Sequence, residues 1–114
     1  MSGIIGTSRS KSKVVGKSLD TAKVWARSNN DADKLSTFGV SSLADTGTGV
    51  ITVTFSTAFA NVNYVAATMT SDKSGTFMHF CRIADQTTTT CTFQNWENNV
   101  AADGGSYHLI IFGE

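Results

Sequence analysis

Residues Leu43 to Phe59 read LADTGTGVITVTFSTAF, and this stretch decides the fold. From Ile51 to Ser56, apolar and polar side chains alternate strictly, and most of them are β-branched. Because successive side chains of a strand point to opposite faces, this alternation predicts a half-buried β-strand. The residues on its predicted core face are Ile51, Val53 and Phe55, and those on the other face are Thr52, Thr54 and Ser56.

The same stretch contains Asp45-Thr46-Gly47, the triplet that carries the catalytic carboxylate of aspartic proteases. Such a site needs two close carboxylates that share one proton and thereby act as acid and base. The sequence contains no second Asp-Thr-Gly or Asp-Ser-Gly, and no helical pattern follows the closing LIIFG. It therefore favours a five-residue hairpin loop, DTGTG, with glycines at the positive-φ positions.

The remaining chain is predicted to be all-β, since no 3.6-residue apolar stripe is present. Short strand-like runs recur about every ten residues and are separated by turn residues. They predict a single antiparallel β-sandwich, jelly-roll-like and of about seven strands, over residues 21–114. The predicted strands are TAKVWARS, STFGVSSLAD, GVITVTFST, NYVAATMTSD, GTFMHFCRIAD, TTTTCTFQNW and SYHLIIFGE.

Residues 1–20 are predicted to form an extended basic arm that anchors the domain to a partner. The chain up to residue 27 has six basic residues and one acid, and the rest has three basic residues and eight acids. A basic arm on an acidic body points to a partner with a complementary surface, either protein or nucleic acid. The candidate docking residues of the arm are Ile4, Ile5, Arg9, Lys11, Lys13, Val14, Val15 and Lys17.

The length of 114 residues and a hydrophobic content of 40% fit one globular domain. No apolar run approaches the roughly 20 residues of a membrane span. The start of the sequence also lacks the apolar core of a signal peptide. We therefore expect a protein made in the cytoplasm, or part of a particle assembled there, with no membrane span.

Two cysteines and two histidines are candidates for further chemistry. If the hairpin turns around Gln86, Cys81 faces Cys91 directly across two strands, and His79 lies on the face of Cys81. Three readings stay open: buried free thiols, a cross-strand disulfide, or a zinc site completed by His108. A Cys/His nucleophile would also need an orienting partner and an oxyanion donor, and neither is identifiable. We expect no cofactor, no metal and no enzymatic activity.

The chain from TAKVWARS onward resembles a recurrent module of tailed-bacteriophage virion proteins, found in tail-fibre tips and in short free-standing virion proteins of marine and cyanobacterial phages. After its tryptophan strand the module usually carries an Asn-Gly-type turn, where this chain has SNNDADKLST. The residues that carry the resemblance are Ala22, Lys23, Trp25, Phe38, Val40, Ser41, Ser42, Asp45, Gly47, Thr48, Gly49, Thr52, Val53, Phe55, Phe59, Ala60, Asn63 and Tyr64, with the closing LIIFG.

The resemblance implies a non-enzymatic virion structural protein, commonly a homotrimer in this class and located in the virion. Its expected partners are other capsid or tail proteins, as a decoration, knob or fibre-type component, and nucleic acid is not the expected partner. The alternative is a receptor- or carbohydrate-binding module of a tail-fibre tip that contacts a host-surface glycan. For that alternative, the candidate receptor contacts are Trp96 and Tyr107.

Overall fold

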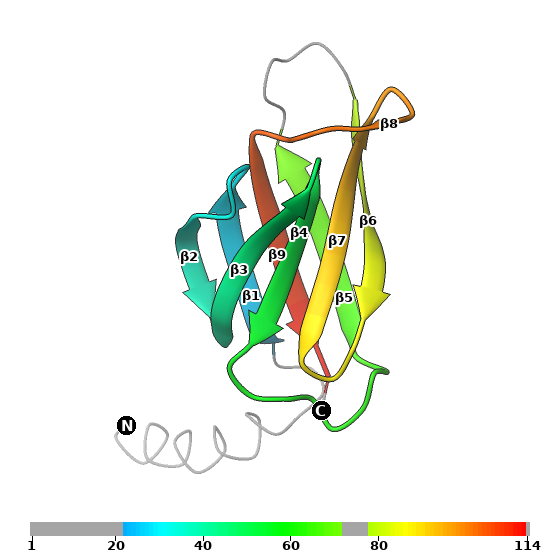
Figure 1. Cartoon of the computed structure of the whole chain (residues 1–114). Coiled ribbons are helices and arrows are strands. Elements are labelled where there is room, and N and C mark those ends of the chain that lie inside the picture. The colour runs from blue at the N-terminus through cyan, green and yellow to red at the C-terminus, as the bar shows by residue number, and fades with distance from the viewer. Residues whose placement is uncertain (1–21, 72–77, 114) are drawn as a thin grey trace, which may run out of the picture.

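The computed structural model describes residues 22–71 and 78–113, which form an all-β sandwich (Figure 1). The predicted fold class is confirmed, while the predicted arm, residues 1–20, lies outside the described residues. The strands are β1 (Ala22–Asn29), β2 (Lys34–Phe38), β3 (Val40–Gly47), β4 (Val50–Phe55), β5 (Val65–Ser71), β6 (His79–Gln86), β7 (Thr90–Glu97), β8 (Val100–Ala101) and β9 (Ser106–Phe112).

Two antiparallel sheets form the two layers. Sheet A has the order β2-β1-β9-β5, and sheet B has the order β3-β4-β7-β6 with β8 paired to β7 (Figure 1). The last strand, β9, lies in the middle of sheet A between β1 and β5, so sheet A needs both ends of the described chain. In the described part of the chain, no helix is long and apolar enough to cross a membrane.

The structure has nine strands where the sequence predicted about seven, for two local reasons. The run STFGVSSLAD is divided at Gly39, whose φ of 71° turns the chain out of sheet A and into sheet B. The short strand β8 follows a tight turn at Asn98 and Asn99, with φ of 50° and 65°. Two successive positive φ values suit a two-residue hairpin, and asparagine tolerates them better than most residues.

The first hairpin, β1–β2, forms without the Asn-Gly turn of the resembling module. The side chain of Asn29 replaces that turn: its Oδ1 accepts hydrogen bonds from the backbone N–H of Asp31 at 3.0 Å and of Asp33 at 2.9 Å. Ala32 takes the positive φ of 64°. An Asx-type turn is a known property of asparagine, so SNNDADKLST contains the turn in a different form.

The DTGTG segment forms a tighter turn than predicted. Asp45 and Gly47 belong to β3, and Gly47 pairs with Val50 at the start of β4, so only Thr48 and Gly49 form the turn. Gly49 has a φ of 69°, whereas Gly47 has no positive φ. The expected five-residue loop with two positive-φ glycines is therefore wrong, because strand pairing continues to the last residue before the turn.

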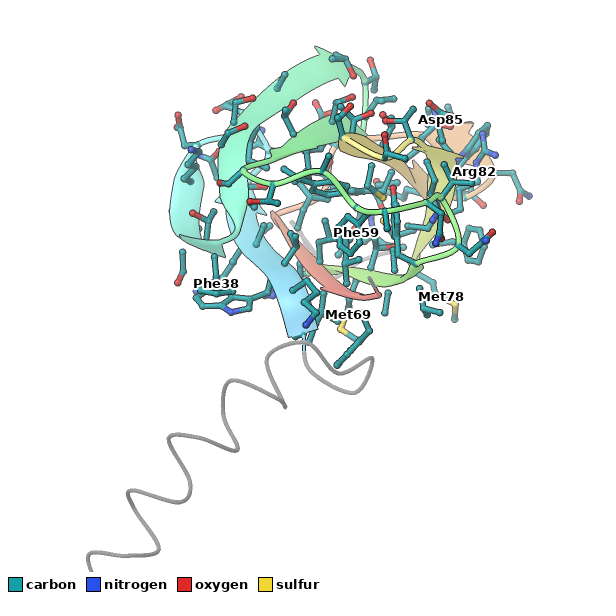
Figure 2. The ribbon with its side chains drawn as sticks, turned by 90° about the horizontal axis from the view of Figure 1, so that it is seen from below. Phe38, Phe59, Met69, Met78, Arg82 and Asp85 are labelled. Atoms are coloured by element: carbon teal, nitrogen blue, oxygen red, sulfur yellow. The ribbon has the colours of Figure 1, made fainter. Side chains whose placement is uncertain are left out.

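The predicted core strand is confirmed. Ile51, Val53 and Phe55 of β4 are buried between the sheets, and Cys91 and Phe93 of β7 lie beside them. Sheet A contributes Val24, Ala26, Tyr107, Leu109 and Ile111. Figure 2 shows Phe59 between the two layers, while Phe38 and Met69 lie on the outer side of sheet A.

An aromatic cluster closes one end of the sandwich. The segment between β4 and β5 places Phe59 and Tyr64 against Phe55, with ring centroids 5.0 and 5.6 Å from that of Phe55. The Tyr64 hydroxyl lies 2.9 Å from the carbonyl oxygens of both Thr87 and Thr90 in the β6–β7 turn. The crossover between the sheets is thus fixed to sheet B by packing and by hydrogen bonding.

The hairpin of β6 and β7 forms, but its register differs from the predicted one. Gln86 pairs with Cys91, and Cys81 pairs with Asn95, so the cysteines do not face each other. The turn lies later than expected because Thr87 closes it: the N–H of Thr87 donates to the carbonyl of Thr90, and its hydroxyl accepts from the N–H of Thr90 at 2.9 Å. Four successive threonines gave the sequence no sharp turn signal.

Candidate functional site: the outer surface around Trp96

The most site-like feature on sheet B is a concave surface on the outer side of β6 and β7. Trp96 pairs directly with Phe80, so both side chains stand on the face that points away from the core. They border a hollow of about 520 Å³ together with Met78, Arg82 and the turn residues Asn98 and Asn99. Trp96 is half-buried, whereas Phe80 is 65% and Met78 is 89% exposed.

Arg82 gives this surface its charge and part of its shape. Its guanidinium carbon lies 5.9 Å from the centre of the Trp96 ring, a cation–π distance. One of its nitrogens donates a hydrogen bond to Gln94 Oε1 at 3.0 Å, which fixes the guanidinium over β7. The remaining N–H groups of Arg82 can donate hydrogen bonds to a ligand, and the amides of Asn98 and Asn99 at the border of the hollow offer further donors and acceptors.

An aromatic pair bordered by amides and a guanidinium is suited to polar ligands with apolar faces. A sugar ring has this character, since its C–H face packs on an aromatic ring while its hydroxyls bond amides and guanidinium. Among the described residues that line the hollow, the polar groups are the Arg82 guanidinium and the amides of Asn98 and Asn99, all of which can hydrogen-bond a ligand.

The second predicted contact residue, Tyr107, is placed elsewhere, and its prediction as an exposed aromatic is wrong. It is 1% exposed and packs in the core against Phe93, with ring centroids 5.7 Å apart. Its hydroxyl accepts a hydrogen bond from the Gly104 N–H at 2.8 Å. Burial raises the pKa of Tyr107. Tyr107 faces inward because β9 alternates Tyr107, Leu109 and Ile111 toward the core.

The thiols and imidazoles do not assemble into a site. Both cysteines are free, so the disulfide alternative is wrong. His108 lies on the outer face of sheet A, while Cys81 and Cys91 face the interior from sheet B. The zinc alternative is wrong because the fourth ligand that it requires lies on a different face from the cysteines. No group of three or more His, Cys, Asp or Glu that could hold a metal occurs in residues 22–71 and 78–113.

Cys91 and His79 each contribute to the structure of sheet B. Burial raises the pKa of the Cys91 thiol to about 11, which keeps it protonated and unreactive near neutral pH. His79 Nδ1 lies 3.0 Å from the Nδ2 of Asn95, a fully buried residue that also donates to the Ala102 carbonyl at 2.8 Å. These contacts link β6, β7 and the segment after β8.

Asp45 is an exposed residue on the edge strand β3, and its Oδ1 accepts a hydrogen bond from the Gly47 N–H at 3.2 Å. That geometry is a local turn contact. The protease alternative required a carboxylate held beside a twin, and the described surroundings of Asp45 provide a strand edge instead.

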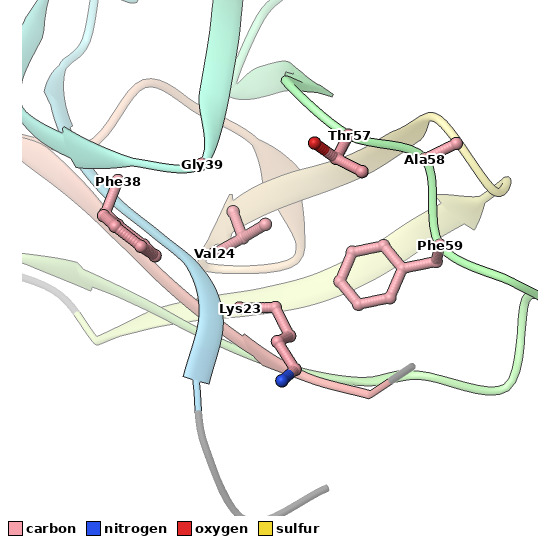
Figure 3. A pocket seen from close by; sticks show the side chains of 7 residues that line it. All are labelled: Lys23, Val24, Phe38, Gly39, Thr57, Ala58 and Phe59. Carbon is pink, nitrogen blue, oxygen red and sulfur yellow. The ribbon is translucent and has the colours of Figure 1, made fainter. Parts of the chain in front are cut away.

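A second hollow, of about 320 Å³, lies at the margin of the sandwich (Figure 3). Its lining is mostly apolar, and the side chain of Lys23 contributes an amine to its border (Figure 3). The hollow is lined by Lys23, Val24, Phe38, Gly39, Thr57, Ala58 and Phe59.

The sequence prediction for the site was incomplete in an instructive way. Trp96 was named, but Phe80, Arg82, Asn98 and Asn99 were not. Alternation alone places Phe80 and Arg82 on the face opposite Cys81, yet their partner on β7 depends on register. The register predicted from the cysteines paired Phe80 with Thr92, which separated it from Trp96. The candidate docking residues of the arm (Ile4, Ile5, Arg9, Lys11, Lys13, Val14, Val15 and Lys17) lie outside the described residues.

Comparisons of the chain with models of known protein families, with curated proteins and with solved structures gave no match.

Proposed function

We propose that this protein is a non-enzymatic structural component of a tailed-bacteriophage virion. It attaches to the capsid or tail as a decoration, knob or fibre-type protein. In this proposal residues 1–20 anchor the chain to another virion protein, the sandwich projects outward, and the protein is a homotrimer. Assembly takes place in the host cytoplasm.

The support for this proposal is that several residues of the phage-module resemblance help to build the sandwich. Phe55, Phe59 and Tyr64 make the aromatic cluster that closes one end. Gly49 forms the turn at the other end. A resemblance that follows framework residues points to a shared building block, and a building block that recurs in virions favours a structural role.

Oligomer formation also has a physical reason. Each sheet has two edge strands, β2 and β5 in sheet A and β3 and β6 in sheet B. Charged residues make up only 16% of the chain, so these edges have few of the charges that normally prevent edge-to-edge pairing. Fixed partners within a particle would protect them.

The decisive experiment is peptide mapping of purified virions, with copy number measured against the major capsid protein. A structural component is present in stoichiometric amounts: hundreds of copies fit capsid decoration, and a few copies per particle fit a tail position. Absence of the protein from particles that are infectious and complete would overturn the proposal.

The anchoring arm is tested separately by deleting residues 1–18. We expect a folded domain that no longer joins the particle. Two matched variants separate the apolar from the basic contribution of the arm. One replaces the four apolar residues with Ser (Ile4, Ile5, Val14 and Val15), and the other replaces the four basic residues with Gln (Arg9, Lys11, Lys13 and Lys17). Loss of incorporation only in the Gln variant, with strongly salt-dependent DNA binding by the intact chain, would favour nucleic acid as the arm's partner. Normal incorporation of the truncated chain would contradict the anchor.

A second candidate function is glycan binding, and the surface around Trp96 favours it. Phe80 and Trp96 stand side by side over a hollow of about 520 Å³, with Arg82 and two asparagine amides at its border. In this alternative the protein is a receptor-binding module of a tail-fibre tip. Stacking on one aromatic ring contributes on the order of 1 kcal/mol, so a single site would bind weakly and rely on several copies.

The test uses Phe80→Ala, because Phe80 is exposed and its removal leaves the core intact, together with Trp96→Ala. Leu35→Ala, at an exposed position of β2 in the other sheet, is the control. Glycan-array binding and host adsorption are expected to fall at least tenfold in the first two variants and to stay unchanged in the control. Equal behaviour of all three would exclude the Trp96 surface as the receptor site.

A further inference from the structure

Arg82 supplies the charge of the hollow around Trp96. It is exposed, and the described residues that line the hollow carry this one positive charge and no acid. Two neutral groups hold the guanidinium: Gln94 Oε1 at 3.0 Å and the Trp96 ring, whose centre is 5.9 Å from the guanidinium carbon. Because neither group neutralises it, the positive charge stays available to a ligand.

The described acids of β6 and β7 lie away from the hollow. Glu97 follows Trp96 on β7, so alternation places its side chain on the opposite face of sheet B. Asp85 is exposed on β6, but it lies three residues from Arg82 on the side away from Phe80. The charge at the border of the hollow is therefore that of the guanidinium alone, and it favours an anionic group on the ligand.

Phe80 offers the apolar part of the surface. The guanidinium lies over the ring of Trp96, whereas Phe80 is 65% exposed and is the more open of the two rings. Phe80 and Arg82 are two residues apart on β6 and stand on the same face, so about 6.6 Å separates their positions along the strand. A sugar ring packed on Phe80 can therefore direct a carboxylate of that ring to the guanidinium.

The geometry of the guanidinium suits a carboxylate. After its bond to Gln94, Arg82 keeps further N–H groups, and two of them can donate to the two oxygens of one carboxylate. The side-chain amides of Asn98 and Asn99, at the border of the same hollow, can bond sugar hydroxyls.

One arginine also favours a single negative charge over a polyanionic chain. Nucleic acid is bound by several basic residues, each of which neutralises a phosphate. Here the charged residue that follows Arg82 on β6 is Asp85, and the chain after residue 27 has three basic residues and eight acids. A continuing line of phosphates would meet repulsion, whereas a single sugar carboxylate would not.

We infer that the surface around Trp96 binds an acidic sugar, with the sugar ring on Phe80 and its carboxylate on the Arg82 guanidinium. The inference rests on the glycan-binding function considered above and names the class of glycan. Uronic acids and sialic acids share this chemistry, because each has a carboxylate attached to a sugar ring.

The experiment compares matched acidic and neutral oligosaccharides by NMR titration of the full chain, with the Trp96 indole signal as a probe of the site. One pair is a glucuronic acid oligosaccharide and its carboxyl-reduced form, and the other is sialyllactose and lactose. In one of the pairs, the wild type is expected to bind the acidic member about tenfold more tightly, as a charge-assisted hydrogen bond would provide. The pair that shows this preference distinguishes uronic from sialic acids.

Three variants assign the preference to Arg82. Arg82→Gln is expected to bind both members of the pair equally, and Arg82→Lys to keep only part of the preference, since lysine has the charge without the two-pronged geometry. Arg27→Gln is the matched control, because it removes the same charge from an exposed position of β1 in sheet A. The control is expected to keep the full preference, and circular dichroism checks that each variant is folded.

Equal binding of acidic and neutral members by the wild type would overturn the inference and leave glycan binding in place. A preference that survives in Arg82→Gln would do the same. Absence of binding to both members of each pair would overturn glycan binding together with the inference. Single-stranded DNA that binds more tightly than the sugars, and does so only when Arg82 is present, would assign the surface to nucleic acid instead.

Discussion

Gly49 lacks a side chain for two separate reasons, and only one of them is visible in the sequence. The turn after β3 requires its φ of 69°, which glycine adopts freely. In addition, a Cβ at this position would lie 2.3 Å from the Ala102 carbonyl oxygen and 2.8 Å from that of Asn95. The turn packs against the chain after β8, and the Gly49 N–H donates to Asp103 Oδ1 at 2.7 Å.

We therefore expect Gly49→Ala to lower the free energy of unfolding by at least about 1–3 kcal/mol, the cost of local backbone strain. Gly47→Ala is the matched control, because Gly47 has no positive φ and its added Cβ would lie 3.6 Å from the nearest side-chain atom. The control is expected to change stability by less than about 0.5 kcal/mol. Urea denaturation measures both, and equal effects would show that close packing around Gly49 is unimportant.

At the scale of elements, the β6–β7 hairpin shows what sets register. The predicted pairing of Cys81 with Cys91 followed from a turn at Gln86, but Thr87 and Thr90 close the turn through backbone and hydroxyl bonds. The partner of Cys81 changes by four residues and that of Cys91 by five, and the bulge between Ile83 and Asp85 absorbs the odd residue, so both cysteines stay on the core face. The change in register moves Phe80 opposite Trp96 and so creates the surface that we consider for glycan binding.

This register predicts that the two thiols stay free. After air oxidation of the folded protein, titration of thiols in denaturant is expected to find two per chain. Asn95→Cys supplies the control, since position 95 directly faces Cys81 and cross-strand neighbours lie at distances that a disulfide can bridge. That variant is expected to lose two of its three thiols. Loss of both thiols within single wild-type chains would mean that the observed register is wrong.

At the scale of the whole molecule, buried titratable groups make the sandwich sensitive to alkali. Burial raises the pKa of Cys91 from 9.0 to about 11 and that of Tyr64 from 10.0 to about 12. The unfolded chain therefore loses these protons at lower pH than the folded chain does. Both groups contribute stability that is fully present below about pH 9 and is lost as the pH rises toward 12.

Titration of Cys91 and Tyr64 is accordingly expected to leave the midpoint of thermal unfolding unchanged below pH 9 and to lower it between pH 9 and 12. Cys91→Val keeps an apolar side chain in the core and removes the thiol, so it should reduce the fall between pH 9 and 10. The thiol of Cys91 also raises the pKa of Tyr64, but burial is the larger cause and remains in that variant, so a smaller fall above pH 10 is expected to persist. A wild type and a Cys91→Val variant with the same pH profile would contradict a buried thiol with a raised pKa.

The sequence by itself determined the all-β class, the core face of β4 and the presence of most strands, because alternation and turn residues are local properties. Tertiary structure decided which strands are neighbours, since β9 enters sheet A between β1 and β5 from the far end of the chain. It also decided that Tyr107 is buried, that Gly39 transfers the chain between sheets, and that Trp96 meets Phe80. Each of these depends on register or on packing between distant segments, and no local pattern of residues contains that information.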